Sequence, residues 1–347
     1  MRQEEGNLKV HITNIYGHSS VSTALKAQNR TADLAREVLN FNELGIYCYQ
    51  VNSDSPEMLS TRLDGIIAPV GHGDIVIFQY PTWNDIRFDK GLINRISHYR
   101  GLKKIFFVHD ILSLMFESNR CHLKEHIAFF NQADLIILPS QRMLDFLYAE
   151  GLSVKKAVIQ KMWDFPVAID QTVIPAFRKV INFAGNPDLP KFEFVKDWNY
   201  GGVELRVTAE KGDWAQGKKI GFLGWFKNDI SLLTALRKSG GFGLVWTNDS
   251  NWKEYMMMNA NYKLSAYLAA GIPIIVSNCI AERDTVVRKN LGLAVDSLDE
   301  AVNKIENMSD AQYNDMTANV AVFSELIRDG YFTRKCLTDA VFQLLYD

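Results

Sequence analysis

Residues 259–273, NANYKLSAYLAAGIP, have the pattern of a helix that presents its first turn to an anion. Asn259 or Asn261 can cap this helix, because an asparagine side chain accepts hydrogen bonds from the first amides of a helix. Gly271 suits the left-handed position just beyond a helix end, where glycine is favoured. The pattern therefore predicts a helix over residues 261–270, followed by a strand.

Lys263 is the residue of this helix whose position most strongly suggests a ligand. It lies in the first turn, where a positive charge opposes the helix dipole by ~0.3–1 kcal/mol. A diphosphate would satisfy both the lysine and the exposed helix amides, so we predict an anion site here. The alternative is a solvated surface lysine. Leu264, Tyr267 and Leu268 follow at helical spacing and are predicted to face the core.

A small polar turn, TNIYGHSS at residues 13–20, follows the first predicted strand. Its backbone amides and hydroxyls around Gly17 could meet a phosphate or a sugar. Ser22 or Thr23 could instead simply cap the helix that follows. The pattern leaves both interpretations open, and the chain contains neither a GxGxxG nor a Walker motif.

His109 and Asp110 stand at the end of another predicted strand. Imidazole titrates near neutral pH, so such a pair could supply a general base. The alternative is a structural histidine beside an aspartate that caps the next helix. His72 precedes a strand instead of following one and is discounted. The chain has no HExxH or DxD motif, so its residue pattern does not call for a metal.

Two strand ends in the second half carry further candidates. FAGNP, residues 183–187, is followed shortly by Lys191. Gly224 precedes Trp225 and Phe226, and a glycine followed by aromatic residues could let a base ring stack. The two aromatic side chains could equally belong to the core.

The candidate residues lie at the ends of predicted strands, which alternate with predicted helices along the chain. Strands are predicted over residues 9–15, 46–51, 74–80, 104–109, 134–139, 157–159, 179–184, 205–209, 219–223, 242–246, 273–277 and 293–296. Helices are predicted over residues 22–39, 84–99, 230–238 and 261–270, and from residue 310 onward. Near-continuous apolar strands separated by helices are typical of parallel sheets covered on both faces. We therefore predict an α/β fold of two doubly wound, Rossmann-like domains facing an interdomain cleft, with ligands at the strands' carboxyl ends.

Composition excludes several classes of protein. The 347 residues include 38 Lys and Arg and 40 Asp and Glu, which argues against a nucleic-acid binder that depends on bulk charge. The N-terminus, MRQEEGNL, lacks the apolar stretch of a secretory signal. Apolar runs are far shorter than the ~20 residues of a membrane span, and the four cysteines form no CxxC pair. We expect a soluble, reduced, cytoplasmic protein.

The lysine and the apolar helix that ends in AAGIP resemble the donor-binding helix of GT-B glycosyltransferases. The whole chain resembles the bacterial glucosyltransferases, also called nucleotide sugar synthetase-like proteins, that extend the glycan of serine-rich repeat adhesins. The matching stretches, from residue 10 to about residue 297, are VHITNIYG, FNELGIY, RLDGIIA, GDIVIFQYPTWN, FVHD, LMFESN, VINFAGNP, GFGLVW and KLSAYLAAGIPIIV.

This resemblance implies a metal-independent, cofactor-free transferase that moves a hexose from a UDP-sugar, by expectation UDP-glucose. The implied acceptor is N-acetylglucosamine already O-linked to Ser or Thr of the adhesin. The resemblance assigns UDP contacts to Thr23, Lys191, Phe226, Asn259, Ala260, Asn261, Tyr262, Lys263 and Leu264. It also implies a homo-oligomer, typically a tetramer.

The resemblance further implies a division of labour along the chain. Residues 1–168 would form the acceptor domain, residues 169–330 the UDP-sugar-binding domain, and residues 331–347 a helix that packs back on the acceptor domain. One departure concerns stereochemistry. Many retaining GT-B enzymes place a glutamate five residues before the glycine of AAG, where this chain has Ala266, so the resemblance implies neither ribose recognition nor stereochemistry.

A mechanism follows as a hypothesis. Lys263 and the helix amides would neutralise charge on the departing diphosphate. Gly17 and His109 would meet the acceptor, and Asp110 or His109 would remove the proton of its hydroxyl. Two alternatives stay open: a galactofuranosyltransferase-like enzyme of polysaccharide synthesis, and a GT-B subunit that binds the acceptor without catalysis.

Overall fold

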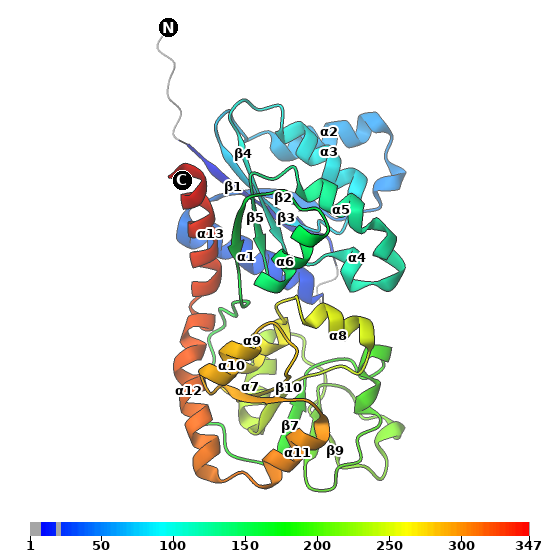
Figure 1. Ribbon diagram of the computed structural model, residues 1–347, viewed down its shortest axis with the longest axis vertical. Coiled ribbons are helices and arrows are strands. Elements are labelled where there is room, and N and C mark those ends of the chain that lie inside the picture. Colours follow the sequence, from blue (N-terminus) through cyan, green and yellow to red (C-terminus); the bar gives the residue numbers. More distant parts are fainter. Residues whose placement is uncertain (1–7, 19–21, 347) are drawn as a thin grey trace. The chain divides into compact units, whose positions relative to one another are not determined.

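A computed structural model describes residues 8–18 and 22–346 of the chain (Figure 1). The described residues form two compact units, and each is considered by itself. The N-terminal unit contains the residues up to Gln160 together with those from Thr333 onward. The C-terminal unit contains Lys161–Phe332.

The N-terminal unit is built on a six-stranded parallel sheet in the order β2-β1-β3-β4-β5-β6. Its strands are β1 (Val10–Tyr16), β2 (Asn42–Tyr47), β3 (Ile75–Tyr80), β4 (Lys103–Val108), β5 (Leu135–Leu138) and β6 (Lys156–Ile159). Every residue of β3 and of β5 is buried, as expected for central strands covered on both faces.

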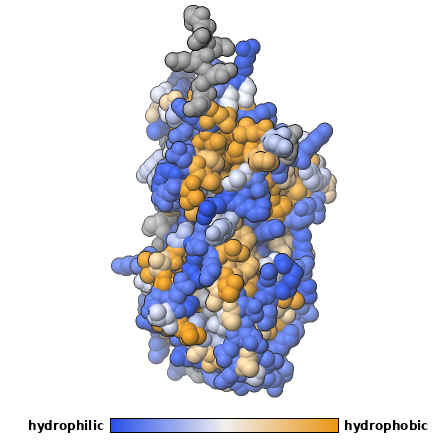
Figure 2. All heavy atoms as spheres, turned by 90° about the vertical axis from the view of Figure 1, so that its left-hand side faces the viewer, coloured by the Kyte–Doolittle hydropathy of each residue, from blue (hydrophilic) through white to orange (hydrophobic). Residues whose placement is uncertain are grey.

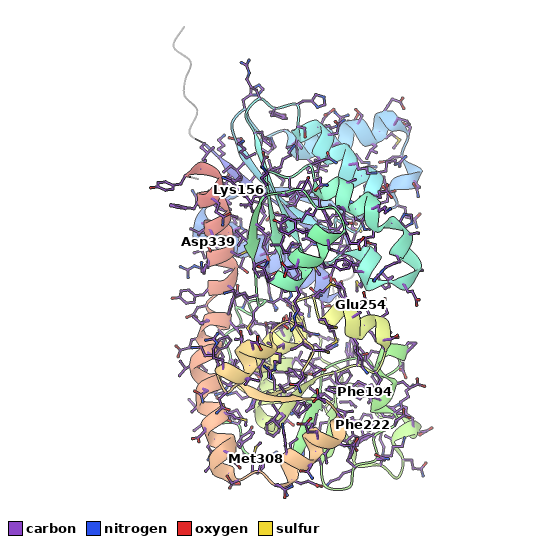
Figure 3. The ribbon with its side chains drawn as sticks, in the orientation of Figure 1. Lys156, Phe194, Phe222, Glu254, Met308 and Asp339 are labelled. Carbon is purple, nitrogen blue, oxygen red and sulfur yellow. The ribbon has the colours of Figure 1, made fainter. Side chains whose placement is uncertain are left out.

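Helices flank this sheet (Figure 1). They are α1 (Thr23–Leu39), α2 (Pro56–Ile67), α3 (Ile86–Ile96), α4 (Leu112–Met115), α5 (Leu123–Phe130), α6 (Gln141–Ala149) and α13 (Tyr331–Leu345), with short 3₁₀ turns at Val51–Ser53 and Glu117–His122. The Lys156 ammonium on β6 donates to the Gln343 carbonyl of α13 over 2.6 Å, and Figure 3 labels Lys156 on the strand and Asp339 on that helix. The closing helix of the chain therefore packs on the N-terminal unit.

The C-terminal unit repeats the design with a six-stranded parallel sheet in the order β12-β11-β10-β7-β8-β9. Its strands are β7 (Val180–Phe183), β8 (Glu204–Val207), β9 (Ile220–Phe222), β10 (Phe242–Val245), β11 (Ile274–Ser277) and β12 (Gly292–Val295). Its helices are α7 (Asp229–Ser239), α8 (Ser250–Met256), α9 (Tyr262–Ala269), α10 (Arg283–Arg288), α11 (Leu298–Glu306) and α12 (Asp310–Arg328), with 3₁₀ turns at Pro190–Val195 and Asp213–Ala215.

Tyr267 of α9 fixes the helix against this second sheet. Its ring lies over Gly243 of β10 so closely that a Cβ at Gly243 would be 2.2 Å from the ring. Its hydroxyl accepts a hydrogen bond from the Ala184 amide, 2.7 Å away, just beyond β7. The buried tyrosine therefore connects the start of one loop at the sheet's carboxyl edge to the helix that carries Lys263.

The predicted α/β class with two doubly wound units is confirmed, and a strand lies at or near each of the predicted positions. One strand was placed wrongly: β2 spans Asn42–Tyr47, whereas the apolar pattern predicted residues 46–51. The reason is that β2 is an edge strand. Only its alternate residues Leu44 and Ile46 face the core, so it lacks the continuous apolar run of a central strand. None of the helices in the described part of the chain has the length and hydropathy needed to cross a membrane.

Candidate active site

Lys263 lies in the first turn of α9, as predicted. The helix is capped by Asn261, whose side-chain oxygen accepts a hydrogen bond from the Lys263 amide over 3.0 Å. The Asn261 amide in turn donates to the Glu282 carboxylate over 3.0 Å. Gly271, with φ of +82°, follows the helix end in the left-handed conformation. Between the two predicted capping residues, the structure therefore selects Asn261.

The ammonium of Lys263 lies over aromatic rings. Its Nζ is 4.2 Å from the ring centre of Phe192 and 5.5 Å from that of Phe183. Lys191 approaches the same group of rings, with its Nζ 5.2 Å from the centre of Phe192 and 3.3 Å from that of Trp252. Both ammonium groups therefore lie near the ring of Phe192, an arrangement stabilised in part by cation–π attraction.

The charge of Lys263 lacks an acidic partner in the part of the chain that the structure describes. Among the residues that the structure describes, no carboxylate forms an ion pair with its ammonium. Burial, and then the positive charge of Lys191, lower the pKa of Lys263 to about 7. Both causes disfavour the ammonium form of Lys263. A bound anion would have the opposite effect: its negative charge would stabilise the ammonium and raise the pKa of Lys263.

A small cavity of about 60 Å³ opens beside these lysines. Its walls come from the 3₁₀ turn after β7, the end of β10, α8 and the first turn of α9, and include Lys191, Phe192, Trp246, Thr247, Trp252, Asn261 and Lys263. The Thr247 hydroxyl donates to the Lys191 carbonyl over 2.6 Å and so ties two of these walls together. Phe194, which is labelled in Figure 3, packs edge-on against Phe183 in the C-terminal unit, with ring centres 5.3 Å apart. Cations between aromatic walls suit a small anionic group such as a phosphate.

The other residues assigned to UDP lie near this cavity in the sequence but differ in exposure. Leu264 is fully buried, and Ala260 is buried with its carbonyl accepting from the Trp163 indole over 2.9 Å. Tyr262 packs on Phe165, with ring centres 4.9 Å apart. The side chains of Leu264 and Ala260 therefore serve the core, and any contact of theirs with a ligand would use the backbone.

Asn259 and Phe226 are partly buried. The Asn259 amide donates to the Tyr255 carbonyl over 2.9 Å, which continues the helical hydrogen bonding beyond α8 toward the cap of α9. Phe226 follows Gly224, which has φ of +81°, and Trp225, which is 57% exposed. The alternative that Trp225 belongs to the core is therefore wrong, because this loop turns its indole to solvent.

In the N-terminal unit, the predicted turn after β1 is centred on Gly17. This residue has φ of +78°, and a Cβ there would lie 2.6 Å from the ring of Tyr47. Ser22 caps α1 by accepting from the Leu25 amide over 3.4 Å, so the capping interpretation holds for Ser22. Thr23 is exposed in the first turn of α1. Residues 19–21 of this region lie outside the described part of the chain.

His109 and Asp110 follow β4 directly. His109 is buried, its ring is stacked on Phe107 with centres 4.5 Å apart, and its amide donates to the Tyr80 carbonyl over 2.8 Å. Burial lowers the pKa of His109 to about 3, so its imidazole is neutral at pH 7 and accepts protons weakly. This environment agrees with a structural histidine better than with a general base.

Asp110 is more accessible than its neighbour, being only partly buried. The N-cap residue of α4 is Ile111, whose side chain cannot accept a hydrogen bond, so Asp110 does not occupy the N-cap position. Of the two candidates, Asp110 is therefore the better placed to exchange a proton with a ligand.

His72, which was discounted, accepts a hydrogen bond from the Arg100 amide over 2.8 Å and belongs to a turn before β3.

Phe192, Thr247 and Trp252 are the site residues that the sequence pattern missed. They come from three segments, and only the fold brings them around Lys263. One signal was present: the stretch from Phe183 to Tyr200 contains five aromatic residues, more than a simple loop needs. Within the described ranges, His, Cys, Asp and Glu side chains form no group of three that could hold a metal ion.

Domain matches and full-length relatives of this chain point to the same family. Residues 9–162 match the domain described as Glucosyltransferase 3-like, N-terminal domain, and residues 181–340 match Glucosyltransferase 3-like, C-terminal domain. Glucosyltransferase 3 of Streptococcus parasanguinis is 42% identical over 98% of this chain and 100% of its own length. Glucosyltransferase 3 of Streptococcus gordonii is also 42% identical, over 97% of this chain and 100% of its length. A β-1,6-galactofuranosyltransferase, WbbI of Escherichia coli K12, is 23% identical over 96% of this chain and 98% of its length.

Solved structures agree on the fold. Sucrose-phosphate synthase from Thermosynechococcus elongatus superposes with a TM-score of 0.68 at 13% identity, over 97% of this chain and 99% of that one. Anabaena HepE, solved in complex with UDP and glucose, superposes with a TM-score of 0.65 at 10% identity, over 97% of this chain and 100% of that one. The predicted GT-B fold class is thereby confirmed.

Proposed function

The chain belongs to the glucosyltransferase 3-like family of glycosyltransferases, and on that premise we propose that it transfers glucose from UDP-glucose. The proposed acceptor is N-acetylglucosamine O-linked to a serine-rich repeat adhesin. One observation carries the donor assignment. The Lys263 ammonium, in the first turn of α9, meets aromatic rings and no ion-pairing carboxylate in the described part of the chain.

The unliganded site is electrostatically unfavourable. A partly buried lysine beside a second lysine, at the positive end of a helix, is unfavourable in the unliganded protein. A diphosphate removes that cost, because its negative charge attracts both ammonium groups and the helix dipole. Phe192 and Trp252 hold the two lysines in place and add flat surfaces against which a uracil ring can lie.

The proposed chemistry is a direct exchange of bonds at the anomeric carbon of the donor. The acceptor oxygen forms a bond to this carbon as the carbon's bond to the diphosphate oxygen breaks. Asp110 takes the proton that the acceptor hydroxyl loses, and Lys263 stabilises the negative charge left on UDP. The lysine thus supplies the charge that a metal supplies in other transferases, and we propose that the reaction is metal-independent.

A second transferase function shares the fold and part of the sequence. The relation to a β-1,6-galactofuranosyltransferase extends over 96% of the chain, so transfer of a furanose to a polysaccharide is the competing candidate. The identity of 42% to Glucosyltransferase 3 favours glucose over that candidate. A subunit that binds the acceptor without catalysis would not need Lys263, so UDP binding separates it from both enzymes.

We also propose that the protein forms a homo-oligomer, with a tetramer as the expected state. Apolar residues gather on the face of the molecule seen in Figure 2. Helix α13 exposes two large apolar side chains, Phe342 and Leu345, each 56% exposed. Such side chains suit burial against another copy of the chain.

The test is mass spectrometry of a serine-rich peptide carrying O-linked N-acetylglucosamine, incubated with the protein, EDTA and one UDP-sugar at a time. We expect a single hexose to be added from UDP-glucose alone. A panel of free and lipid-linked glycans with UDP-galactofuranose tests the competing function. Addition of a furanose to those glycans, with no change to the peptide, would replace the present proposal.

A further inference from the structure

A second cavity lies in the N-terminal unit, against the edge strand β2. It measures about 290 Å³, near the lower end, ~300 Å³, of known ligand pockets. Strand β2, the segment after it, α2 and α3 contribute its walls, which include Gly45, Tyr47, Tyr49, Arg62, Gly65 and Phe88. The residues assigned to UDP and to proton transfer do not line this cavity.

Two glycines keep the cavity open. Gly65 lies inside α2, where glycine is unfavourable relative to alanine. A Cβ at Gly65 would have no atom within 4 Å, so close packing does not require a glycine at this position. Gly45 lies on the exposed face of β2, where a Cβ would touch only the Tyr16 ring at 3.5 and 3.8 Å. The missing side chains therefore leave space beside the sheet edge.

An aromatic and cationic wall borders that space. The ring of Tyr47 is 66% exposed, which is unusual for a large aromatic side chain on a strand. The guanidinium of Arg62 lies 4.8 Å from the centre of the Tyr49 ring. Asp54 fixes this pair, because it accepts from the Tyr49 hydroxyl over 2.6 Å and from Arg62 Nε over 2.9 Å. The Arg62 side chain as a whole is 51% exposed.

Tyr47 connects the cavity to the proposed acceptor region. Its ring covers Gly17: a Cβ at Gly17 would lie 2.6 Å from Cε2 and from Cζ of the Tyr47 ring, and 2.9 Å from Cε1. The same ring lines the cavity. A ligand that reached the turn after β1 would therefore meet Tyr47 as its next surface.

We propose that this cavity binds a pyranose ring of the acceptor glycoprotein, next to the sugar that is modified. The apolar face of the pyranose stacks on Tyr47, and the Arg62 guanidinium donates to its hydroxyls. A flat aromatic surface with one fixed polar group is the usual composition of a small, selective ligand pocket. The identity of the acceptor rests on the proposed function, but the cavity as a sugar site does not.

A direct binding experiment tests the sugar site alone. Saturation-transfer NMR is recorded with methyl N-acetyl-β-D-glucosaminide and the wild-type protein, Tyr47→Ala, Tyr47→Phe and Gly65→Leu. We expect binding about fivefold weaker in Tyr47→Ala and Gly65→Leu, and retained in Tyr47→Phe, since phenylalanine keeps the stacking surface. The matched control is Tyr346→Ala, which removes a tyrosine that is 78% exposed on the same unit. Equal binding by wild type, Tyr47→Ala and Gly65→Leu would overturn the proposal.

A kinetic experiment then tests the link to the acceptor. Serine-rich peptides carrying one or three O-linked N-acetylglucosamine groups are compared as acceptors. We expect wild type to have a lower KM for the triply modified peptide, and Gly65→Leu to lose most of that difference. If wild type modifies neither peptide, the proposed function fails while the NMR result still decides the sugar site. If wild type modifies both and Gly65→Leu keeps the full KM difference, the link of this cavity to the acceptor is wrong.

Discussion

The carboxyl strand ends of the two units differ in how their polar groups are satisfied. In the N-terminal unit, neutral or buried groups bond to one another: the Gln28 amide donates to the Pro81 carbonyl over 2.8 Å, and the Thr82 hydroxyl donates to the Asp89 carboxyl over 2.5 Å. In the C-terminal unit, the Lys263 ammonium faces aromatic rings and has no acidic partner in the described chain.

This difference indicates what each unit recognises. An unbalanced cation in a partly buried place attracts an anion, which suits the diphosphate of a nucleotide sugar. A hydrogen-bonded and largely neutral edge suits a neutral ligand such as a sugar hydroxyl, with one carboxylate available for its proton. In the proposed mechanism, the C-terminal unit therefore stabilises charge and the N-terminal unit accepts a proton.

Substitution of Asp110 is expected to have the largest effect. Asp110→Asn keeps the size of the side chain but removes the proton acceptor, so kcat should fall by about 10³-fold. The measurement is the initial rate of hexose transfer, together with the melting temperature. Asp145→Asn, an exposed aspartate of α6, is the matched control. A normal rate in Asp110→Asn would assign proton removal to another group.

Substitution of Lys263 addresses the other unit. Lys263→Ala removes the charge that stabilises the departing diphosphate, and transfer should slow by about 10²-fold. Folding should be unaffected or improved, because the variant loses a cation that burial and Lys191 disfavour. Lys304→Ala, which breaks a surface pair with Glu300, is the control of equal charge. A rate equal to that of wild type would exclude the proposed role of Lys263.

The affinity for UDP should depend on pH with a defined sign. The pKa of Lys263 is lowered from 10.5 to about 7 in the unliganded protein, and a bound diphosphate favours the ammonium form. Below pH 7 the lysine is already protonated, so its contribution is constant. Above pH 7 binding must take up a proton, so affinity should fall by up to about tenfold per pH unit. Titration calorimetry at pH 6.5, 7.5 and 8.5 measures this fall, which Lys263→Ala should lack.

A smaller effect is expected from the contact that holds α9 on its sheet. Gly243→Ala would place a Cβ 2.2 Å from the Tyr267 ring, so the ring must shift, at a cost of about 1–3 kcal/mol. The expected fall in melting temperature is roughly 2–10 °C. Gly65→Ala, where a Cβ meets no atom within 4 Å, is the control and should raise stability slightly. An equal shift in both variants would show that the ring is not held tightly.

Local patterns predicted the part of the site that lies in one segment. The asparagine cap, Lys263 in the first turn and the glycine after the helix are all encoded within residues 259–273 and were found from the sequence. The central strands were found for a similar reason, because residues buried on both faces form continuous apolar runs. The edge strand β2 was displaced by four residues, since half of its residues face away from the core.

Long-range contacts limited the rest of the prediction. Phe192 reaches Lys263 from about 70 residues away, and Trp252 reaches Lys191 from about 60 residues away. No local spacing encodes either approach. The environment of His109 was likewise hidden, because its burial and its stacking on Phe107 depend on the neighbouring strands. Trp225 was left open between core and ligand, and only the turn at Gly224 showed that its indole is exposed.

The central claim, that the C-terminal unit binds the diphosphate of the donor through Lys263, is tested most directly by calorimetry with UDP and uridine. Wild type should bind UDP at least tenfold more tightly than uridine, because only UDP carries the diphosphate. Lys263→Ala should lose most of this difference while binding uridine as before. Equal preference for UDP in wild type and Lys263→Ala would contradict the claim.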